Sequence, residues 1–476
     1  MDILKKAFDA EIFRQEGHRL IDLLADYLLQ VSEDRSSKVI HWQSPEVEWR
    51  DWEVDFQQQG KPVSELFEAV LKRSIHLHQP GYMGHQISPP APVAALSGLL
   101  DNFLNNGMGV YEMGVAGTAI EQLVVKITAK QMGFGENAGG VLTSGGSLAN
   151  LTALLAARSN SAEENIWQEG STAQLALLVS EEAHYCVDRA VRIMGWGEAG
   201  IIKVPVNERF KMRTDLLEAC LSDAKNKGKE VIAVVGSACS TSTGSFDDLV
   251  AIADFCEKHQ LWFHVDGAHG GATVFSNQYR HLVEGIERAD SVAMDYHKML
   301  LTPAIATALI FKNGQEAYRT FSQKAQYLWS QADEEEWFNL AKRTFECTKL
   351  MMGVKVYSIM RTYGLEVFDA FVSQMYDLGR QFAAKILSRK NWELAVTPEC
   401  NIVCFRYQPQ DLSTEEADAL NDRVRQQIIE EGVFYIVKTR LRGKTWLRTT
   451  LTNPFTREED LLLLLDKVES LALQGV

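Results

Sequence analysis

The sequence predicts an α/β protein with a helical arm over residues 1–85, a large domain with a mostly parallel sheet over 86–349, and a small α+β domain over 350–476. Three patterns carry this prediction. Apolar residues recur at helical spacing near the start, short apolar runs alternate with helical stretches from about residue 140 to 311, and strands mix with helices after residue 350. Continuous apolar strands joined by helices are typical of a parallel sheet covered on both faces.

The arm is predicted from apolar side chains spaced three and four residues apart. The repeat begins at Ile3, Ala7 and Phe8 and continues to Leu28 and Val31, which is the spacing of one helix face. Such a helix must bury its apolar stripe, and either the body of the protein or a second subunit could cover it.

Six apolar runs of the large domain are predicted to be strands separated by helices. They are Val141–Thr143, Leu175–Val179, Ile201–Val206, Val231–Val235, Leu261–Val265 and Ser291–Met294. Because ligands of such folds bind at the carboxyl ends of the strands, the residues after each strand are the first candidates for a site. The small domain is expected to combine helices over Leu350–Tyr363 and Asp422–Glu431 with a strand at Ile402–Phe405.

The charge balance argues against nucleic acid or anionic lipid as a main partner. The 476 residues include 48 Lys and Arg against 63 Asp and Glu, a formal net charge of −15, which repels phosphate-rich surfaces. No window approaches the roughly 18 apolar residues of a spanning helix. Lys5 and Lys6 interrupt the apolar start that a secretory signal would need. A cytoplasmic protein without membrane contact is expected.

The cysteine pattern predicts reduced, buried thiols and no metal site. Seven cysteines include no CxxC pair, and Cys400 and Cys404 form a close couple without a second couple or a nearby histidine. His264, Asp266 and His269 are also close in sequence, but no third cluster completes a shell of metal ligands.

The segment from Gly139 to Ser147 combines a strand, a turn of small residues and a helix start. Glycines let backbone amides crowd an anion, and the free amides of a helix start bind it. The segment therefore suits a phosphate, although such a turn can also be purely structural. It lacks the P-loop lysine and the spacing of a dinucleotide fingerprint, which disfavours nucleoside triphosphates and NAD.

Two further strand ends carry chemically active groups. Asp266 closes an apolar strand, where a carboxylate needs a partner: it could cap a helix, pair with an arginine or hold a protonated ring nitrogen. Lys298 follows His297 after the apolar run that ends at Met294. Desolvation would lower the pKa of such a lysine and make its amine nucleophilic toward carbonyl groups. Together with the phosphate turn, these residues describe a site for a phosphorylated pyridine aldehyde.

These segments resemble the group II pyridoxal-phosphate decarboxylases, the family of aromatic amino acid, glutamate and diaminobutyrate decarboxylases. The resemblance covers most of the chain and is most specific at Phe263–Gly271 and Asp295–Lys298. It implies a fold-type-I enzyme with a mainly parallel seven-stranded sheet, pyridoxal 5'-phosphate (PLP) as cofactor, and a homodimer with sites at the subunit interface.

The resemblance also implies roles for individual residues. Lys298 would hold the cofactor covalently, Asp266 would pair with the ring nitrogen, and His184, otherwise a core histidine, would stack on the ring. The other cofactor-binding positions that it implies are Gly146, Ser147, Thr241, Ala268, Asp295 and His297.

Five more positions match the substrate side and the reaction type of the family. Tyr327 falls at the position of a catalytic loop tyrosine, which favours plain decarboxylation over aldehyde formation, although it could be an ordinary loop aromatic. Arg448 matches an arginine that meets the substrate carboxylate. His85 and Ser88 lie in a segment closer to the diaminobutyrate type. Glu112 sits where that type has an acid, but it could also cap a helix or bridge subunits.

The expected activity is α-decarboxylation of an L-amino acid to an amine and CO2, with a diaminobutyrate-like, aromatic or acidic substrate. Two alternatives remain open at this point. The same cofactor and fold could support aminotransfer or aldehyde formation, and the chain could be a catalytically silent scaffold. The intact set of Lys298, Asp266, His184 and Tyr327 disfavours the silent scaffold.

Overall fold

The computed structural model describes residues 3–161, 166–321 and 336–474. The chain forms two compact units. The larger unit comprises Gln86–Arg380 and Val396–Val403, and the smaller one comprises Met1–His85, Gln381–Ala395 and Cys404–Val476. The three-part division at residues 85 and 349 stays a prediction.

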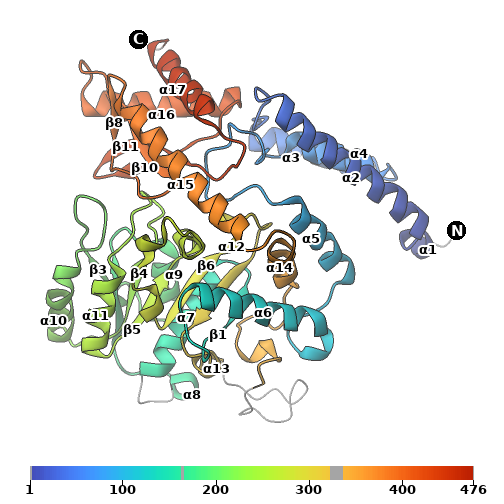
Figure 1. Cartoon of the computed structure of the whole chain (residues 1–476). Coiled ribbons are helices and arrows are strands. Elements are labelled where there is room, and N and C mark those ends of the chain that lie inside the picture. The colour runs from blue at the N-terminus through green and yellow to red at the C-terminus, as the bar shows by residue number, and fades with distance from the viewer. Residues whose placement is uncertain (1–2, 162–165, 322–335, 475–476) are drawn as a thin grey trace. The chain divides into compact units, whose positions relative to one another are not determined.

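The larger unit contains a seven-stranded sheet in the order β1-β7-β6-β5-β4-β2-β3 (Figure 1). Its strands are β1 (Gly139–Thr143), β2 (Leu175–Ser180), β3 (Ile201–Val204), β4 (Glu230–Ser237), β5 (Trp262–Asp266), β6 (Ser291–Asp295) and β7 (Thr307–Phe311). The neighbours from β6 to β3 pair in parallel, whereas β7 is antiparallel to both β1 and β6. The sheet confirms the predicted fold class, and β7 is a strand that the six predicted runs did not include.

Helices pack around this sheet. They are α5 (Pro92–Leu104), α6 (Val115–Gln131), α7 (Gly146–Ser161), α8 (Ile166–Glu169), α9 (Tyr185–Ile193), α10 (Leu217–Asn226), α11 (Leu249–His259), α12 (Tyr296–Met299), α13 (Glu316–Thr320) and α14 (Met352–Tyr363). The helix α15 (Glu366–Leu387) contributes residues to both units.

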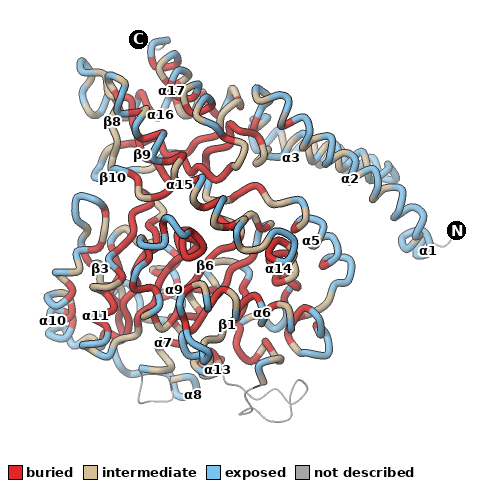
Figure 2. Tube along the Cα trace, viewed as in Figure 1, coloured by how far each residue is buried: buried red, intermediate tan, exposed pale blue. Residues whose placement is uncertain are grey.

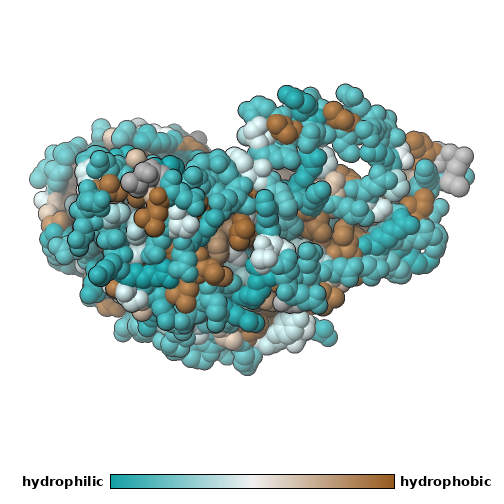
Figure 3. Space-filling view, turned by 90° about the horizontal axis from the view of Figure 1, so that it is seen from above, coloured by the Kyte–Doolittle hydropathy of each residue, from teal (hydrophilic) through white to brown (hydrophobic). Residues whose placement is uncertain are grey.

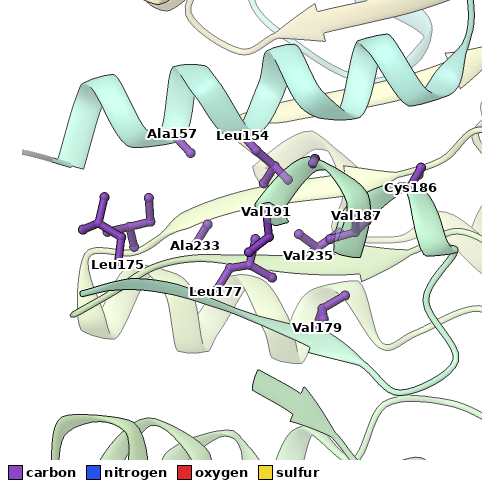
Figure 4. Close-up of a cluster of buried hydrophobic side chains, with 12 residues drawn as sticks. Leu154, Ala157, Leu175, Leu177, Val179, Cys186, Val187, Val191, Ala233 and Val235 are labelled. Atoms are coloured by element: carbon purple, nitrogen blue, oxygen red, sulfur yellow. The ribbon is translucent and has the colours of Figure 1, made fainter. Parts of the chain in front are cut away.

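Both faces of the sheet are buried, as β2 shows. Leu175, Leu177 and Val179 point to one face, where they pack with α7 and α9 (Figure 4). Ala176 and Leu178, which alternate with them and point to the opposite face, are equally inaccessible. Figure 2 shows the resulting buried centre of the unit. A sheet covered in this way leaves the ends of its strands as the places where polar groups can meet a ligand.

The smaller unit contains a four-stranded sheet in the order β10-β11-β9-β8. Its strands are β8 (Trp392–Leu394), β9 (Ile402–Tyr407), β10 (Val437–Leu441) and β11 (Lys444–Thr450), and its last two helices are α16 (Thr414–Glu431) and α17 (Glu458–Leu473). A capping box at Ser413 and Glu416 begins α16, and Gly432 in the left-handed conformation ends it. This confirms the expected mixture of strands and helices after residue 400.

The predicted arm forms helices whose apolar residues stay largely uncovered within the chain. They are α1 (Ile3–Ala7), α2 (Ala10–Glu33), α3 (Pro45–Phe56) and α4 (Val63–Arg73). The side chain of Asp9 caps α2 by accepting from the amides of Glu11 and Ile12, which separates α1 from α2. No residue of α1, α3 or α4 is buried, and these helices are mostly pale blue and tan in Figure 2.

Among the described residues, no helix combines the length and the apolar character needed to cross a membrane. All seven cysteines are free thiols. Five of them are buried as expected, but Cys347 is exposed and Cys220 is only partly covered, so the expectation of buried thiols is wrong at these two positions.

Candidate active site

Strand register brings the predicted site residues to one edge of the large sheet. Ser237 at the end of β4 pairs with Asp266 at the end of β5. Asp295 at the end of β6 pairs with Thr307 of β7, which in turn pairs with Thr143 at the end of β1. The segments that follow these strand ends therefore leave the sheet side by side, and they carry the glycine-rich turn, the strand-end carboxylate and the lysine.

These segments enclose a cavity of about 120 Å3 within the larger unit. Its lining residues are Gly146, Ser147, Asn150, His184, Cys186, Cys239, Thr241, Asp266, Ala268, His269, Asp295 and Lys298. Every predicted cofactor-binding residue except His297 lies in this lining. Residues that are far apart in the sequence thus form one site.

Lys298 and Asp295 form an ion pair in the cavity wall. The Nζ atom of Lys298 lies 3.0 Å from Oδ2 of Asp295. Thr307 donates a hydrogen bond of 2.5 Å to Oδ1 of the same carboxylate, and Nε2 of His297 lies 3.6 Å from Oδ2. Burial alone would raise the pKa of Asp295, but Lys298 and then His297 outweigh it, so the pKa of Asp295 lies below its ordinary value.

The structure corrects the expectation that Lys298 has a lowered pKa. Burial does lower the pKa of this amine, but the carboxylates of Asp295 and Asp266 outweigh burial, and the pKa stands above its ordinary value. The two carboxylates therefore stabilise and orient an ammonium group. The expectation from the sequence included only the desolvation of the lysine. It did not include the carboxylates of Asp266 and Asp295, which stand at the ends of the neighbouring strands β5 and β6.

Asp266 is a buried carboxylate with weak protein partners. Its Oδ1 accepts from the backbone amide of Ala268 at 3.2 Å, and the Cys186 thiol lies 3.9 Å from Oδ2. In the described part of the chain no cationic side chain forms an ion pair with Asp266, so the structure does not pair it with an arginine. Because a buried carboxylate is costly without a charged or strongly donating partner, Asp266 suits a protonated nitrogen of a ligand.

His184 stands at the start of α9, where its side chain caps the helix. Its Nδ1 accepts from the backbone amide of Cys186 at 3.3 Å, which places the ring proton on Nε2. Burial lowers the pKa of His184, while Asp266 raises it and Lys298 lowers it. The net lowering keeps a neutral, flat ring at the cavity wall.

The first turn of α7 supplies backbone amides to the cavity wall. Gly145 adopts φ +123°, a conformation open to glycine, just before the helix begins. A Cβ atom on Gly146 would lie 3.2 Å from Oδ1 of Asp295, so the backbone approaches that carboxylate closely. The amides of a first helical turn have no partner within the helix and attract anions. This geometry suits a phosphate held beside Ser147.

The remaining predicted residues lie around the lining or in the other unit. Ser88 is buried, and its amide and hydroxyl donate to the carbonyl of His297 at 3.1 and 3.4 Å, which places it beside the lysine segment. Glu112 is exposed in a short 3-10 helix and does not line the cavity. Tyr327 lies outside the described residues.

His85 and Arg448 belong to the smaller unit. Partial burial lowers the pKa of His85, and the charges of Arg448 and Arg425 lower it further. Arg448 is buried on β11, where it pairs with Val437 of β10. The assignment of Arg448 to the substrate carboxylate and of His85 to the substrate site stays a prediction.

Four lining residues were missed by sequence reasoning as parts of this site: Asn150, Cys186, Cys239 and His269. Asn150 lies one helical turn into α7, so helical spacing from Gly146 could have indicated it. Cys239 lies two residues from Thr241 and follows β4 directly, which is the place where ligands of such folds bind. From the sequence, His269 was considered only as a possible metal ligand.

The residues present fit PLP. The cavity offers an amine in Lys298, an acceptor for a ring nitrogen in Asp266, a flat neutral ring in His184 and an anion-binding helix start at Gly146 and Ser147. An aldehyde, a protonated pyridine nitrogen, an aromatic ring and a phosphate are the groups that such a set complements.

Comparisons with known proteins agree with this set. A family model described as the pyridoxal-dependent decarboxylase conserved domain matches residues 45–408. The aromatic-L-amino-acid decarboxylase of Bacillus atrophaeus is 27% identical over 97% of this chain and 96% of its own length. The L-2,4-diaminobutyrate decarboxylase of Acinetobacter baumannii is 29% identical over 85% of this chain and 82% of its own length. The crystal structure of mouse CSAD is 26% identical, with a TM-score of 0.90 over 98% of this chain and 99% of that chain.

Proposed function

Because the chain belongs to the pyridoxal-dependent decarboxylase family, we propose that it removes the α-carboxylate of an L-amino acid as CO2 and releases the corresponding amine. It is a carboxy-lyase with PLP as cofactor. One observation carries the proposal for its site: the amine of Lys298 and the carboxylate of Asp266 line the same cavity, beside the first turn of α7.

PLP supplies an aldehyde that binds amino groups and an electron-poor ring that accepts the electron pair left by a departing carboxylate. Lys298 is the amine to which we assign the cofactor, and Asp295 holds this amine in place at 3.0 Å. Asp266 would stabilise the positive charge on the ring nitrogen, since it is buried and no cationic side chain of the described residues forms an ion pair with it. His184 offers a neutral ring as a stacking surface.

The phosphate is assigned to the amides of Gly146 and Ser147. Thr241 and Ala268 contribute to the lining, and His297 lies behind Asp295, with its Nε2 3.6 Å from the carboxylate. His297 is therefore proposed as a positioning residue, because it contacts the carboxylate and not the cavity.

Tyr327 and Arg448 are proposed for the steps that involve the substrate. A loop tyrosine can deliver a proton to the α-carbon after CO2 has left, and it can exclude water while it does so. An arginine can hold the substrate carboxylate through two parallel hydrogen bonds, which orients the bond that breaks. Ser88, His85 and Glu112 are proposed as further substrate contacts.

The substrate is one of three classes: a diaminobutyrate-like, an aromatic or an acidic L-amino acid. The names of the relatives include aromatic and diaminobutyrate decarboxylases at almost equal identity, so similarity alone does not separate them. We propose the diaminobutyrate type first, because the segment with His85 and Ser88 is closer to that type. Glu112, which does not line the cavity, is proposed to pair with the side-chain amine.

A panel of L-amino acids from the three classes tests the reaction directly. The purified, PLP-loaded protein should release CO2 and the matching amine in equal amounts from at least one of them. Stoichiometric ammonia, hydrogen peroxide or a keto acid in place of the amine would contradict the proposed reaction. A Glu112→Gln variant should lose rate on a diaminobutyrate-type substrate and not on an aromatic one.

We further propose that the protein is a cytoplasmic homodimer. The support for a dimer is the apolar surface of the N-terminal helices, where Phe8, Trp49 and Phe56 are 87%, 70% and 73% exposed. Figure 3 shows that the surface in this view is mostly hydrophilic, with apolar side chains emerging in separate groups. The proposed dimer would cover these exposed apolar side chains of the N-terminal segment.

A further inference from the structure

Two thiols and an imidazole, none of which has a role in the proposed reaction, meet in the larger unit. Cys239 follows β4, His269 follows β5, and Cys400 precedes β9; all three are buried and belong to the larger unit. One ligand atom of each residue lies within 4.8 Å of those of the other two. The sequence showed no such group, because the three residues come from distant segments and Cys400 has no histidine near it along the chain.

The spacing of the sulfur atoms fits a tetrahedral metal site. The Sγ atoms of Cys239 and Cys400 are 3.9 Å apart. With Zn–S bonds of about 2.3 Å, two sulfurs at tetrahedral positions lie about 3.8 Å apart. A disulfide, by contrast, needs about 2.05 Å, so the sulfurs would have to move closer by almost half of their separation. The separation of the two sulfurs therefore matches that of two ligands of a tetrahedral zinc ion.

Hydrogen bonding orients His269 as a ligand. Its Nε2 lies 2.9 Å from Oδ1 of Asn401, and an amide oxygen can only accept, so Nε2 carries the ring proton and Nδ1 carries the lone pair. The Nδ2 group of Asn401 donates to Sδ of Met299 at 3.2 Å, which fixes the orientation of the amide. A histidine whose second nitrogen donates to a carbonyl-type oxygen is the usual arrangement at metal sites.

Binding of a divalent cation would leave the cluster of Cys239, His269 and Cys400 electrically neutral. Burial, followed by contact with Cys400, raises the pKa of the Cys239 thiol well above its ordinary value. A divalent cation that binds both sulfurs displaces two protons and leaves a neutral complex with two thiolates and one imidazole. A neutral complex can stay buried at little electrostatic cost, and its formation becomes more favourable as the pH rises.

We propose that Cys239, His269 and Cys400 bind one thiophilic divalent cation of the zinc class in the wall of the cofactor cavity. Cys239 and His269 both line that cavity, so the fourth coordination position opens toward it, as in zinc sites that keep one position for a non-protein ligand. The site lies beside the proposed catalytic residues without including them, and it does not depend on the decarboxylation proposed above.

Cadmium titration of the full-length, PLP-loaded protein tests the proposal. We expect one equivalent of Cd2+ to be retained on desalting, an ultraviolet thiolate-to-cadmium band, and two protons released per ion in weakly buffered solution. Zn2+ should displace the cadmium. Cys239→Ser and Cys400→Ser should each abolish the band, and Asn401→Ala should weaken binding by about 10- to 100-fold, the usual cost of losing the partner that orients a histidine ligand.

Cys256→Ala is the matched control, because Cys256 is a buried thiol on α11 outside the group; it should bind the ion like the wild type. Thermal unfolding checks that each serine variant is folded, and His269→Gln provides a third variant that leaves both thiols in place. The proposal is overturned if the wild type retains less than half an equivalent, or if folded Cys239→Ser and Cys400→Ser variants keep the band. Measuring decarboxylation in the presence of a chelator tests the proposed function independently of the proposed metal site.

Discussion

At the scale of single residues, His264 connects the sheet to the proposed phosphate turn. Its Nδ1 accepts from the hydroxyl of Ser291 at 2.8 Å, and its Nε2 donates to Oδ1 of Asn150 at 2.7 Å. Asn150 in turn donates to the carbonyl of Gly146 at 2.9 Å. His264 is completely buried, and burial lowers its pKa to about 4. This histidine is therefore neutral, and its hydrogen bonds depend on that state.

The lowered pKa of His264 predicts a loss of stability in mild acid. Between the unfolded value of about 6.5 and the folded value of about 4, the unfolded chain binds a proton that the folded chain does not bind. Stability is therefore fully present above about pH 6.5 and falls as the pH drops toward 4, by about 3 kcal/mol for this residue. Urea unfolding at a series of pH values measures this loss.

The matched variant for this measurement is His264→Gln, which keeps an amide for hydrogen bonding and cannot titrate in this range. We expect it to be less stable than the wild type at pH 7 and to show a flatter dependence on pH between 6.5 and 4. Comparison of the two slopes removes the contribution of other groups, such as Asp247, whose pKa burial raises to about 6. Parallel slopes would mean that His264 does not bind the proton in question.

Asp266 and Lys298 could be found from the strand pattern, because they stand at or just after a strand end and carry an obvious reactive group, and the cavity contains both. Asn150 and Cys239 also line the cavity, but only the fold brings their distant segments together. The raised pKa of Lys298 could not be predicted either, since it depends on distances to Asp295 and Asp266.

At the scale of elements, the start of α7 sets the distance between backbone amides and the cavity. Gly146 leaves room for the carboxylate of Asp295, because a Cβ atom there would lie 3.2 and 3.3 Å from its two oxygens. Asp295 in turn holds Lys298. A side chain added at Gly146 would therefore displace Asp295, and through Asp295 it would displace Lys298.

Gly146→Ala should weaken PLP binding without destabilising the fold. The new methyl group displaces Asp295 or the first turn of α7, so we expect the dissociation constant for PLP to rise about tenfold, equivalent to about 1.4 kcal/mol. Alanine is a better helix former than glycine, so the melting temperature of the apoprotein should not fall. Absorbance titration of the apoprotein with PLP gives the constant.

Gly135→Ala is the control for this prediction, because a Cβ atom there would meet no atom within 4 Å. It should bind PLP like the wild type. An unchanged PLP constant in Gly146→Ala would show that this helix start does not determine the position of the phosphate.

The elements that the sequence predicted best are the buried parallel strands, since a continuous apolar run between helices has few other interpretations. The strand β7 was missed although its residues are buried. Its sequence Thr307–Phe311 is also a short apolar run, but it follows α12 after a short connection. Nothing in the sequence says that the chain returns antiparallel between β6 and β1, since topology depends on contacts between distant segments.

At the scale of the whole molecule, the N-terminal helices present apolar side chains that the chain itself leaves uncovered. Phe8 and Phe13 are 87% and 52% exposed. The sequence predicted an apolar stripe that needs a cover and left open what covers it. Since the described chain does not bury this stripe, a second copy is the proposed cover, as stable dimers bury apolar surface of this kind.

Replacing Phe8 and Phe13 by aspartate should weaken the dimer. Two charges in an apolar interface are costly, so we expect the dimer dissociation constant to rise at least about tenfold and the variant to elute as a monomer at micromolar concentration. Light scattering coupled to gel filtration measures the mass. Ile193→Asp is the control, since Ile193 is 64% exposed on α9 and should leave the mass unchanged. A wild-type monomer would contradict the proposed assembly.

The identity of the amine that binds the cofactor is central to the proposed chemistry. Borohydride reduction of the PLP-loaded protein, followed by peptide mass spectrometry, identifies this amine directly. We predict one equivalent of reduced cofactor fixed on Lys298 in the wild type and none in Lys298→Ala. A label on another lysine, or a wild-type protein that stays colourless in excess PLP and takes up no label, would contradict this prediction.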